Sequence, residues 1–381
     1  MDIDVVLFDE RGSEWLAQCI PQNAKTVVVS TKISVRGLYR LPFLLSVLKW
    51  VFFGQYGKLG IQGRLVCAYF LALIEKINPI VVISNNDGSE IIRAIGLNHK
   101  KIFVAVVQLA LRERYQNVKI ATLPTYFSFG KAQEKLFSAS GITCDDVRPV
   151  GSLRNSIYRN NSQVHPVETE ENTSLVFISQ WKRGLCLNPR TNLYRAWNEG
   201  HRKTFQAVYR YANIHSMKLN VILRNTFDHA DNMEQQQKYF IEAVRSSEIN
   251  FLSSKNNELA SYPPAYSGEI AVHFLSTLGF EVFGHGRKVL CCIGLGGGQK
   301  FIEEFGIQEL IEELPQEVVL LENDENRIGQ MITDLRSLPL ENYESLTRKA
   351  RNYYMSVEEV EKTHERIQQD ISNTLKSRIV S

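Results

Sequence analysis

The sequence predicts an α/β protein made of two Rossmann-like domains with a helical C-terminus. Short apolar, β-branched runs alternate with segments of helical periodicity, which is typical of βαβ units and a mostly parallel sheet. The alternation stops at a polar stretch over 155–173 and then restarts. The length of 381 residues also fits about two domains of ordinary size.

The first half contains the patterns of one such domain. Buried strands of the kind found in parallel sheets are predicted over 5–8, 26–30, 80–85 and 102–107, and further strands over 118–122, 126–129 and 147–150. Helices are predicted over 35–53, 62–77, 89–95 and 131–140. This half therefore predicts a domain over 1–154, followed by a linker over 155–173.

The second half repeats the architecture without a visible sequence repeat. Strands are predicted over 175–179, 219–223, 249–252, 270–274, 289–293 and 317–321, and helices over 203–217, 235–245 and 277–284. The rest of the chain, over 325–378, is largely helical in its pattern. We expect a second domain over 174–345 and C-terminal helices over 346–381.

Composition excludes several classes of protein. With 44 Lys and Arg against 41 Asp and Glu, the net charge of +3 argues against wholesale nucleic-acid binding. Six cysteines without metal-ligand spacing favour a reducing compartment. The N-terminus lacks signal-peptide features, and the apolar run over 41–53 is too short to span a bilayer. We therefore expect a soluble, cytoplasmic chain.

The most informative motif follows the predicted strand over 270–274. Ser276 and Thr277 stand at a helix start, where hydroxyl and backbone N–H groups suit a phosphate. Glu281 lies one turn further along and can accept hydrogen bonds from a ribose diol. The equally open alternative is a plain N-cap at Ser276 with a surface carboxylate.

This motif, continued by Gly286-Arg287-Lys288-Val289, resembles the donor segment in the second domain of GT-B glycosyltransferases. It is especially similar to enzymes of bacterial capsule and O-antigen synthesis, including transferases of Kdo and sialic-acid-like sugars. The resemblance implies two domains that face a cleft, a nucleotide-sugar co-substrate, and no cofactor or metal. Glu269 and Arg287 are lesser donor-binding candidates, and His273 stands where many retaining members carry a second Glu.

A second candidate segment follows the predicted strand over 80–85. Asp87 and Glu90 lie between this strand and a helix, where a carboxylate could act as the general base on an acceptor hydroxyl. The segment resembles the acidic motif of bacterial sialyltransferases, with Asn86 in the first acidic position. The alternative, a turn at Asp87-Gly88 with Ser89 as a helix cap, is common in proteins.

Two more strand ends carry weaker signals. Arg224-Asn225 follows the strand over 219–223, and the guanidinium could neutralise charge on a departing nucleotide. A surface arginine is the alternative. The glycine-rich stretch over 294–300 resembles a P-loop but lacks its second glycine and its Ser or Thr, so we expect an ordinary loop there.

The helices predicted within 36–77 mix basic, aromatic and apolar residues. Arg36, Arg40, Lys49 and Lys58 occur near Trp50 and Tyr56, a combination that could lie on the inner face of an anionic membrane. Helices that simply cover the sheet are the alternative.

Taken with the resemblance, these residues predict a glycosyltransferase that moves a sugar from a nucleotide donor to a glycan or lipid-linked acceptor. The likeness favours CMP-Kdo or a CMP-nonulosonate as the donor. A polyol-phosphate transferase, a non-hydrolysing sugar epimerase and a catalytically inactive scaffold subunit are the alternatives.

Overall fold

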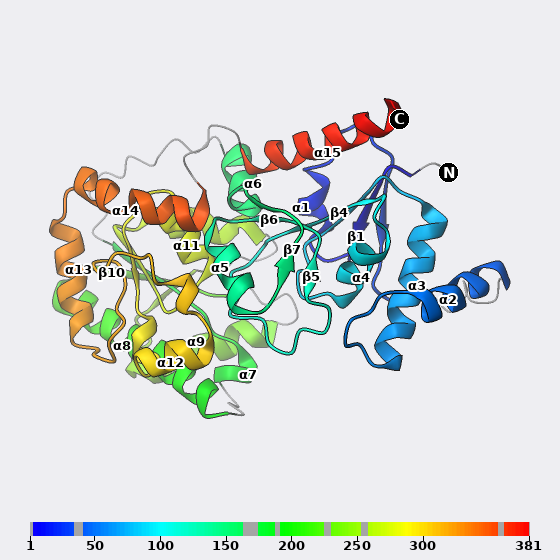
Figure 1. The fold of residues 1–381 in the computed structure, drawn as a ribbon. Coiled ribbons are helices and arrows are strands. Elements are labelled where there is room, and N and C mark those ends of the chain that lie inside the picture. The colour runs from blue at the N-terminus through cyan, green and yellow to red at the C-terminus, as the bar shows by residue number, and fades with distance from the viewer. Residues whose placement is uncertain are drawn as a thin grey trace. The chain divides into compact units, whose positions relative to one another are not determined.

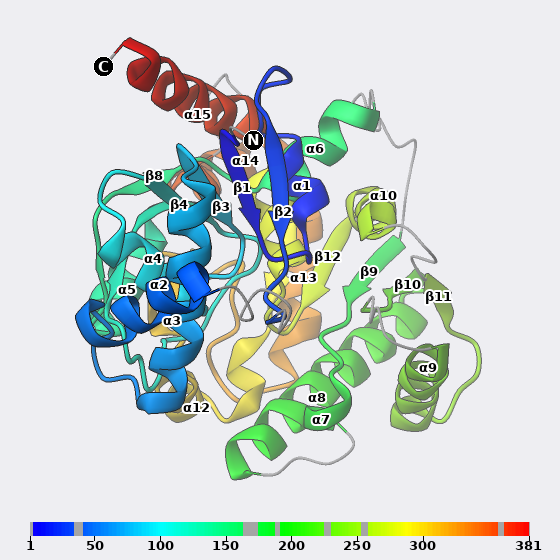
Figure 2. The same cartoon turned by 90° about the vertical axis from the view of Figure 1, so that its right-hand side faces the viewer.

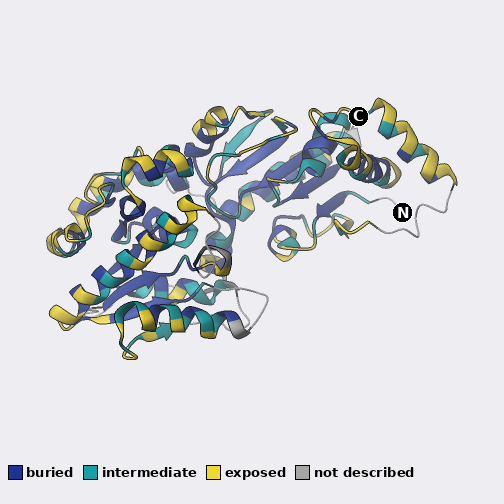
Figure 3. Ribbon diagram, turned by 90° about the horizontal axis from the view of Figure 1, so that it is seen from below, coloured by how far each residue is buried: buried dark blue, intermediate teal, exposed yellow. Residues whose placement is uncertain are grey.

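The computed structural model describes residues 3–33, 41–162, 174–186, 191–224, 230–252, 258–356 and 362–380. The chain divides into two compact units. Unit 1 comprises Met1–Ala110, Arg114–Ile157 and Glu358–Ser381, and unit 2 comprises Leu111–Glu113 and Tyr158–Val357. Each unit contains a parallel sheet with buried strands and flanking helices (Figures 1 and 3). The predicted fold class, two α/β domains with a helical C-terminus, is confirmed.

The sheet of unit 1 has six parallel strands in the order β2-β1-β3-β4-β6-β8. These strands are β1 (Val5–Phe8), β2 (Thr26–Val29), β3 (Val81–Ser84), β4 (Phe103–Val107), β6 (Thr125–Ser128) and β8 (Val147–Pro149). Two short strands, β5 (Thr122–Leu123) and β7 (Thr143–Cys144), pair separately. The central strands are buried because helices cover the sheet, which explains their continuous apolar sequences.

The helices of unit 1 in chain order are α1 (Ser13–Ala17), α2 (Leu41–Phe53), α3 (Ile61–Ile77), α4 (Glu90–Asn98), α5 (Ala132–Ala139) and α15 (Thr363–Val380). Helix α3 supplies much of the core beside β1, as the edge-to-face pair of Phe8 and Phe70 shows, with ring centroids 5.3 Å apart. The predicted helix over 35–53 begins at Leu41 among the described residues, while Arg36 and Arg40 lie outside them.

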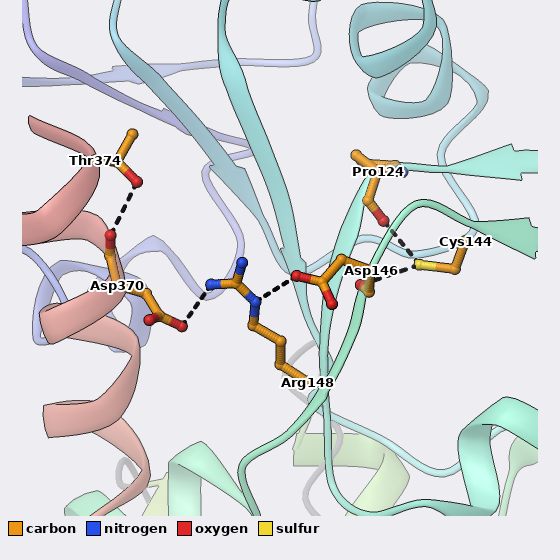
Figure 4. A network of polar contacts seen from close by, with 6 residues as sticks. All are labelled: Pro124, Cys144, Asp146, Arg148, Asp370 and Thr374. Atoms are coloured by element: carbon orange, nitrogen blue, oxygen red, sulfur yellow. Dashed lines mark hydrogen bonds and ion pairs between the residues drawn. The ribbon is translucent and has the colours of Figure 1, made fainter. Parts of the chain in front are cut away.

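Helix α15 joins unit 1 although it ends the chain (Figure 1). Arg148 of β8 donates from Nε to Asp146 at 2.6 Å and from Nη1 to Asp370 of α15 at 2.8 Å (Figure 4). The Thr363 hydroxyl donates to the Val150 carbonyl at 2.7 Å. These contacts, at points more than 200 residues apart in sequence, hold the C-terminal helix against the first sheet.

The sheet of unit 2 has five parallel strands in the order β11-β10-β9-β12-β13. They are β9 (Ser174–Ile178), β10 (Lys218–Ile222), β11 (Asn250–Leu252), β12 (Ile270–His273) and β13 (Val289–Cys291). Thus the first strand of the unit lies between the second and the fourth. This arrangement creates a topological switch point between β9 and β12, where ligands bind in open α/β sheets.

The helices in the unit 2 part of the chain are α7 (Arg183–Cys186), α8 (Asn192–Ile214), α9 (Ala230–Val244), α10 (Tyr262–Ser267), α11 (Thr277–Gly284), α12 (Gln299–Phe305), α13 (Arg327–Ser337) and α14 (Leu340–Met355). Helices α8 and α9 lie side by side (Figure 2), since Phe205 packs against Phe240 with ring centroids 4.6 Å apart. Short 3-10 turns occur at Glu258–Ser261, Ile293–Gly296 and Gln308–Leu310.

Several predicted elements differ from the observed ones. Residues 118–121 form no strand, and pairing begins at Thr122. The helix predicted from Lys203 starts at Asn192, where the Thr191 hydroxyl accepts from the Tyr194 N–H at 3.2 Å. The strand predicted over 317–321 is reduced to one bridge between Val319 and Cys291.

The region predicted as a linker starts inside a helix. Helix α6 (Leu153–Ser162) covers its first residues, and the remainder, 163–173, lies outside the described residues. Helix α6 was missed because its sequence is rich in Asn and Ser, which favour turns when they occur without tertiary contacts.

Candidate functional site at the strand ends

The candidate residues of unit 2 gather in part at the carboxyl ends of its strands. Ser276 and Thr277 follow β12, and Arg224 follows β10. Because all five strands are parallel, these ends share one edge of the sheet, and the loop after β12 borders the switch point. The structure therefore brings Ser276, Thr277 and Arg224 to the same edge.

Glu269 and Arg287 are at the other edge. Glu269 directly precedes β12, and Arg287 lies just before β13, so both are at the amino ends of the strands. Glu269 accepts two hydrogen bonds from Arg336 Nε at 3.0 and 3.2 Å, and Arg287 donates to the Tyr266 carbonyl at 2.7 Å. Burial lowers the pKa of Arg287. These contacts secure the loop before β13 and helix α13, and they do not join the group at the carboxyl edge.

The side chain of His273 binds the backbone at the start of α11. Ser276 is the N-cap, in extended conformation, and its backbone N–H donates to His273 Nδ1 at 3.2 Å. Burial lowers the His273 pKa to about 3, so the ring is neutral and accepts this bond. A Cβ on Gly279 would lie 2.2 Å from the same ring, so glycine is needed for this close approach. His273 thus supports the helix start.

The two hydroxyl candidates of α11 differ in their surroundings. Ser276 is buried, with 2% of its surface exposed, and its side chain makes no capping hydrogen bond. Thr277 is half-buried, and its Oγ1 accepts from the Leu111 N–H at 3.0 Å. A threonine hydroxyl that accepts one bond can still donate another, so Thr277 is the better placed of the two to bind a ligand oxygen.

Glu281 points into the protein. Only 3% of its surface is exposed, and its Oε2 accepts from the Tyr262 hydroxyl at 3.0 Å. Tyr262 in turn stacks with Tyr158 and with Tyr266, at centroid distances of 4.9 and 6.4 Å. This carboxylate therefore ties α11 to α10, and its role at a ribose stays a prediction.

Lys182, which sequence reasoning missed, joins the predicted Arg224 at the carboxyl edge. Lys182 follows β9 by four residues, and Arg224 is the charged group with the largest electrostatic effect on it. Partial burial lowers the pKa values of both groups, and the Arg224 charge lowers the Lys182 pKa further, while Lys182 keeps an exposed surface and Arg224 is half-buried. Glu113 raises the Lys182 pKa, but it forms no ion pair with either group among the described residues. Lys182 and Arg224 are therefore called the cationic pair below.

One glutamine orients the loops that carry the cationic pair. Gln236 of α9 accepts from the Ser179 hydroxyl at 2.6 Å and from the Arg224 N–H at 2.9 Å, and it donates to the Arg224 carbonyl. Arg224 Nη1 and Trp181 Nε1 are buried N–H groups without a hydrogen-bond partner in the described part of the chain. Buried donors in native proteins are nearly always paired. One unused donor on Arg224 itself and one on the nearby Trp181 favour a place for an anionic or strongly accepting ligand.

The glycine-rich loop over 294–298 packs against helix α8 and against the backbone of Leu321. A Cβ on Gly200 of α8 would lie 2.6 Å from the Gly296 nitrogen, and one on Gly294 would lie 2.2 Å from the Leu321 carbonyl carbon. Gly297 and Gly298 both have positive φ. These glycines allow close backbone contact, as expected for a loop that is no P-loop.

In unit 1, Asp87 lies in the loop after β3, beside the switch point between β1 and β3. Its carboxylate is buried, with 2% of the residue exposed. Its Oδ2 accepts from the hydroxyls of Tyr115 at 2.8 Å and Tyr126 at 2.9 Å. The geometry therefore shows Asp87 as a hub of internal hydrogen bonds, and its role as a base stays a prediction.

Glu90 also has internal partners. Its two carboxylate oxygens accept from the backbone N–H groups of Lys119 and Ile120, both at 3.1 Å. Ser89 caps α4 by accepting from the Ile92 N–H at 3.5 Å, as the turn-and-cap alternative expected. Glu90 thus fixes the loop over 119–120 to the start of α4.

The loop after β1 was missed by sequence reasoning. Asp9 has a φ of +89°, a conformation that costs free energy for any residue except glycine, and its Oδ1 accepts from the Arg11 N–H at 3.2 Å. Asn85 donates to the Arg11 carbonyl at 2.8 Å, which joins this loop to the one after β3. An acidic pair, Asp9-Glu10, directly after the first strand was the available signal. Strain at a switch point makes this loop a further candidate.

Comparison with known proteins gives one family match and many similar structures. A family model described as "putative O-antigen biosynthesis protein" matches residues 142–297, which is less than half of the chain and includes the cationic pair and α11. A search of curated proteins finds no match.

The similar structures establish the fold. A UDP-GlcNAc 2-epimerase from Neisseria meningitidis is 13% identical, with a TM-score of 0.55 over 99% of this chain and 100% of that one. The UDP-GlcNAc 2-epimerase from Methanocaldococcus jannaschii is 13% identical, with a TM-score of 0.53 over 98% and 100%. A glycosyltransferase from Rickettsia africae is 10% identical, with a TM-score of 0.53 over 99% and 100%. This chain has the GT-B-like fold that these proteins share.

Proposed function

We propose that this protein is a glycosyltransferase of bacterial surface-polysaccharide synthesis that uses a nucleotide-sugar donor. The observation that carries the proposal is the cationic pair at the carboxyl edge of the unit 2 sheet, with unused buried donors on Arg224 and on Trp181. A fold shared with nucleotide-sugar enzymes and an O-antigen family model over the same region support it.

The chemistry needs positive charge where the donor loses its nucleotide. As the bond between sugar and phosphate breaks, negative charge grows on the phosphate oxygens. Preorganised cations stabilise this charge most when little water surrounds them. Arg224 is half-buried and can act in this way, Lys182 adds an exposed positive charge, and the Thr277 hydroxyl and the start of α11 can contact other phosphate oxygens. In this proposal side chains, rather than a bound metal ion, balance the charge.

The donor and the acceptor follow from the resemblance of the α11 segment. CMP-Kdo or a CMP-nonulosonate is the preferred donor, and a glycan or lipid-linked sugar is the acceptor. A carboxylate of unit 1 takes the proton of the acceptor hydroxyl. Asp87 is the residue that the sequence predicts, and Asp9 is the alternative, since it lies beside the same switch point in a strained conformation.

Nucleotide binding tests the donor half of this proposal. CMP, UDP, GDP and TDP are added separately to the full chain, and thermal unfolding is followed. A nucleotide present at ~100 times its Kd should stabilise the protein by about 2.7 kcal/mol. Lys182→Ala should sharply reduce the shift, while Lys238→Ala, at an exposed pair on α9, should leave it unchanged. If none of the four nucleotides raises the melting temperature, the donor site is refuted.

Turnover separates the proposed transferase from a sugar epimerase, a second candidate because epimerases share this fold over almost the whole chain. The chain is incubated with CMP-Kdo or UDP-GlcNAc, with and without a lipid-linked glycan acceptor and with EDTA throughout. A transferase releases nucleotide only when the acceptor is present. Appearance of an epimerised nucleotide sugar without acceptor would establish the alternative activity, and binding without either reaction would favour an inactive scaffold subunit.

A further inference from the structure

Helix α2 and the start of α3 expose an unusual amount of hydrocarbon. Eight of the fourteen exposed large apolar side chains in the described residues fall within 41–65. Six of them belong to α2: Leu41, Leu44, Leu45, Leu48, Phe52 and Phe53. Phe52 and Phe53 are 77% and 80% exposed. Figure 3 shows most of this helix as exposed. Ile61 and Leu65 of α3 complete what we call the α2–α3 apolar surface.

The polar side chains of α2 are turned away from this surface. Ser46, Lys49 and Trp50 are the only residues of the helix with hydrogen-bonding side chains, and all three donate to the carboxylate of Glu75 on α3. Phe43 and Val47 pack into the core, where Phe43 meets Tyr69 edge-to-face. A helix that covers a sheet normally presents its polar residues to water. Here the polar residues bind the neighbouring helix, and leucine and phenylalanine remain outside.

Basic groups predominate around the surface. Between 41 and 74 the chain contains Lys49, Lys58 and Arg64 and no acidic residue. Lys49 is paired with Glu75 of α3, whereas Lys58 and Arg64 form no ion pair among the described residues. A second copy of the chain meeting the same surface about a two-fold axis would bring the unpaired basic groups of both copies together. An anionic lipid surface supplies both the hydrocarbon and the opposite charge.

The size of α2 determines how it could meet a bilayer. Its 13 residues extend about 20 Å, less than the ~30 Å hydrocarbon core. Among the described residues, no helix is long and apolar enough to cross a membrane. A short helix with an apolar outer face and basic neighbours instead lies in the plane of the interface.

We propose that the α2–α3 apolar surface binds unit 1 to an anionic lipid bilayer, with α2 lying in the membrane interface. This inference goes beyond the proposed transferase activity and does not depend on it, because neither nucleotide nor acceptor is needed for binding. If both hold, the enzyme meets a lipid-linked acceptor where that acceptor is anchored.

Vesicle flotation tests this proposal on the full chain. The protein is mixed with vesicles of phosphatidylcholine alone or of equal parts phosphatidylcholine and phosphatidylglycerol. We expect clear binding to the anionic vesicles and much weaker binding to the neutral ones. The double change Phe52→Ser and Phe53→Ser should weaken binding by about tenfold or more, because it removes two exposed rings that would enter the interface.

Matched variants separate surface effects from general ones. Ile214→Ser on α8, at a residue that is 77% exposed, should leave vesicle binding unchanged. Lys58→Glu should reduce the preference for anionic vesicles, whereas Lys218→Glu, at an exposed residue of unit 2, should not. An unchanged melting temperature confirms that each variant is folded.

Three outcomes overturn the proposal. The wild-type chain could fail to bind anionic vesicles, or the Phe52 and Phe53 variant could bind as tightly as the wild type. Sedimentation could also show a dimer that the same double change dissociates, in which case a second copy occupies the surface. Loss of nucleotide binding with retained vesicle binding would refute the proposed function and leave this inference standing.

Discussion

Each of the two parallel sheets has a switch point, but the charged residues near the two points differ in how many hydrogen-bond partners they have within the protein. In unit 1, the carboxylates of Asp87 and Glu90 each accept two hydrogen bonds from nearby tyrosine hydroxyls or backbone N–H groups. In unit 2, Lys182 and Arg224 form no ion pair among the described residues, although Glu113 raises the pKa of Lys182. A charged group with hydrogen-bond partners inside the protein stabilises the fold. A pair of cations without an ion-pair partner can still bind an anionic ligand. The first pair therefore has internal partners in the fold, and the second pair is the one for which ligand binding is proposed.

The largest expected effect comes from removing the cationic pair. Lys182→Ala combined with Arg224→Ala should weaken nucleotide binding by about a thousandfold, since hydrogen bonds to charged groups contribute about 1.5–3 kcal/mol each. Isothermal titration calorimetry measures this loss of affinity, with the nucleotide that stabilises the wild type as the ligand. Lys238→Ala serves as the control. Unweakened binding in the double variant would show that the pair is merely part of the fold. It would contradict the proposal that the charged residues of unit 2 bind a ligand.

The next largest effect should come from Asp87. Asp87→Ala leaves the Tyr115 and Tyr126 hydroxyls without their acceptor and should lower the free energy of unfolding by about 2–4 kcal/mol. Urea unfolding of single and combined Tyr→Phe variants measures the coupling between these side chains. Asp87→Asn extends the test to catalysis. If Asp87→Asn abolishes transfer while stability and nucleotide binding stay normal, Asp87 is the base. Asp87 then has a catalytic role in addition to its internal hydrogen bonds.

A smaller effect is expected at the start of α11. Gly279→Ala places a Cβ against the His273 ring and should destabilise the protein by about 1–3 kcal/mol through overpacking. The combined change with His273→Ala, which makes room for the methyl group, should not add the two costs. Chemical denaturation of the three variants measures this non-additivity. Fully additive losses would show that His273 does not support the helix start.

The two units should differ in how their stability changes at acidic pH. Burial lowers the pKa values of His201, His273 and His285, all in unit 2, from 6.5 to about 3, and Arg159 and Arg351 lower that of His285 further. Below pH 6.5 these histidines are therefore protonated in the unfolded chain, whereas they stay neutral in the folded chain. Stability conferred by each neutral ring is present above pH 6.5 and is lost as the pH falls towards 3, by up to about 1.4 kcal/mol per pH unit.

Hydrogen exchange at several pH values locates this loss. Unit 1 contains two less deeply buried histidines with lowered pKa values, His99 and His364, so its protection should fall more gradually. Peptides from α8 and β12 should therefore lose protection at a higher pH than peptides from β1 and α3. Equal acid sensitivity of the two groups of peptides would contradict the assignment.

The fold was largely predictable because buried parallel strands carry a local signature. Runs such as Val5–Phe8 and Val81–Ser84 are apolar throughout, since both faces of the sheet are covered. Elements without such a signature were harder to predict. Helix α6 is polar, the first turns of α8 carry few apolar residues, and α15 joins unit 1 only through contacts such as Arg148 with Asp370.

The sequence by itself determined the strand-and-helix alternation, and with it the strand ends where a ligand site had to be sought. It placed Arg224, Ser276 and Thr277 at those ends. Only the tertiary structure decided that Lys182 belongs beside Arg224, that Glu269 and Arg287 lie at the opposite edge, and that Asp87 and Glu281 bind their own tyrosines. The reason is physical: periodicity depends on neighbours in sequence, whereas charge balance and desolvation depend on neighbours in space.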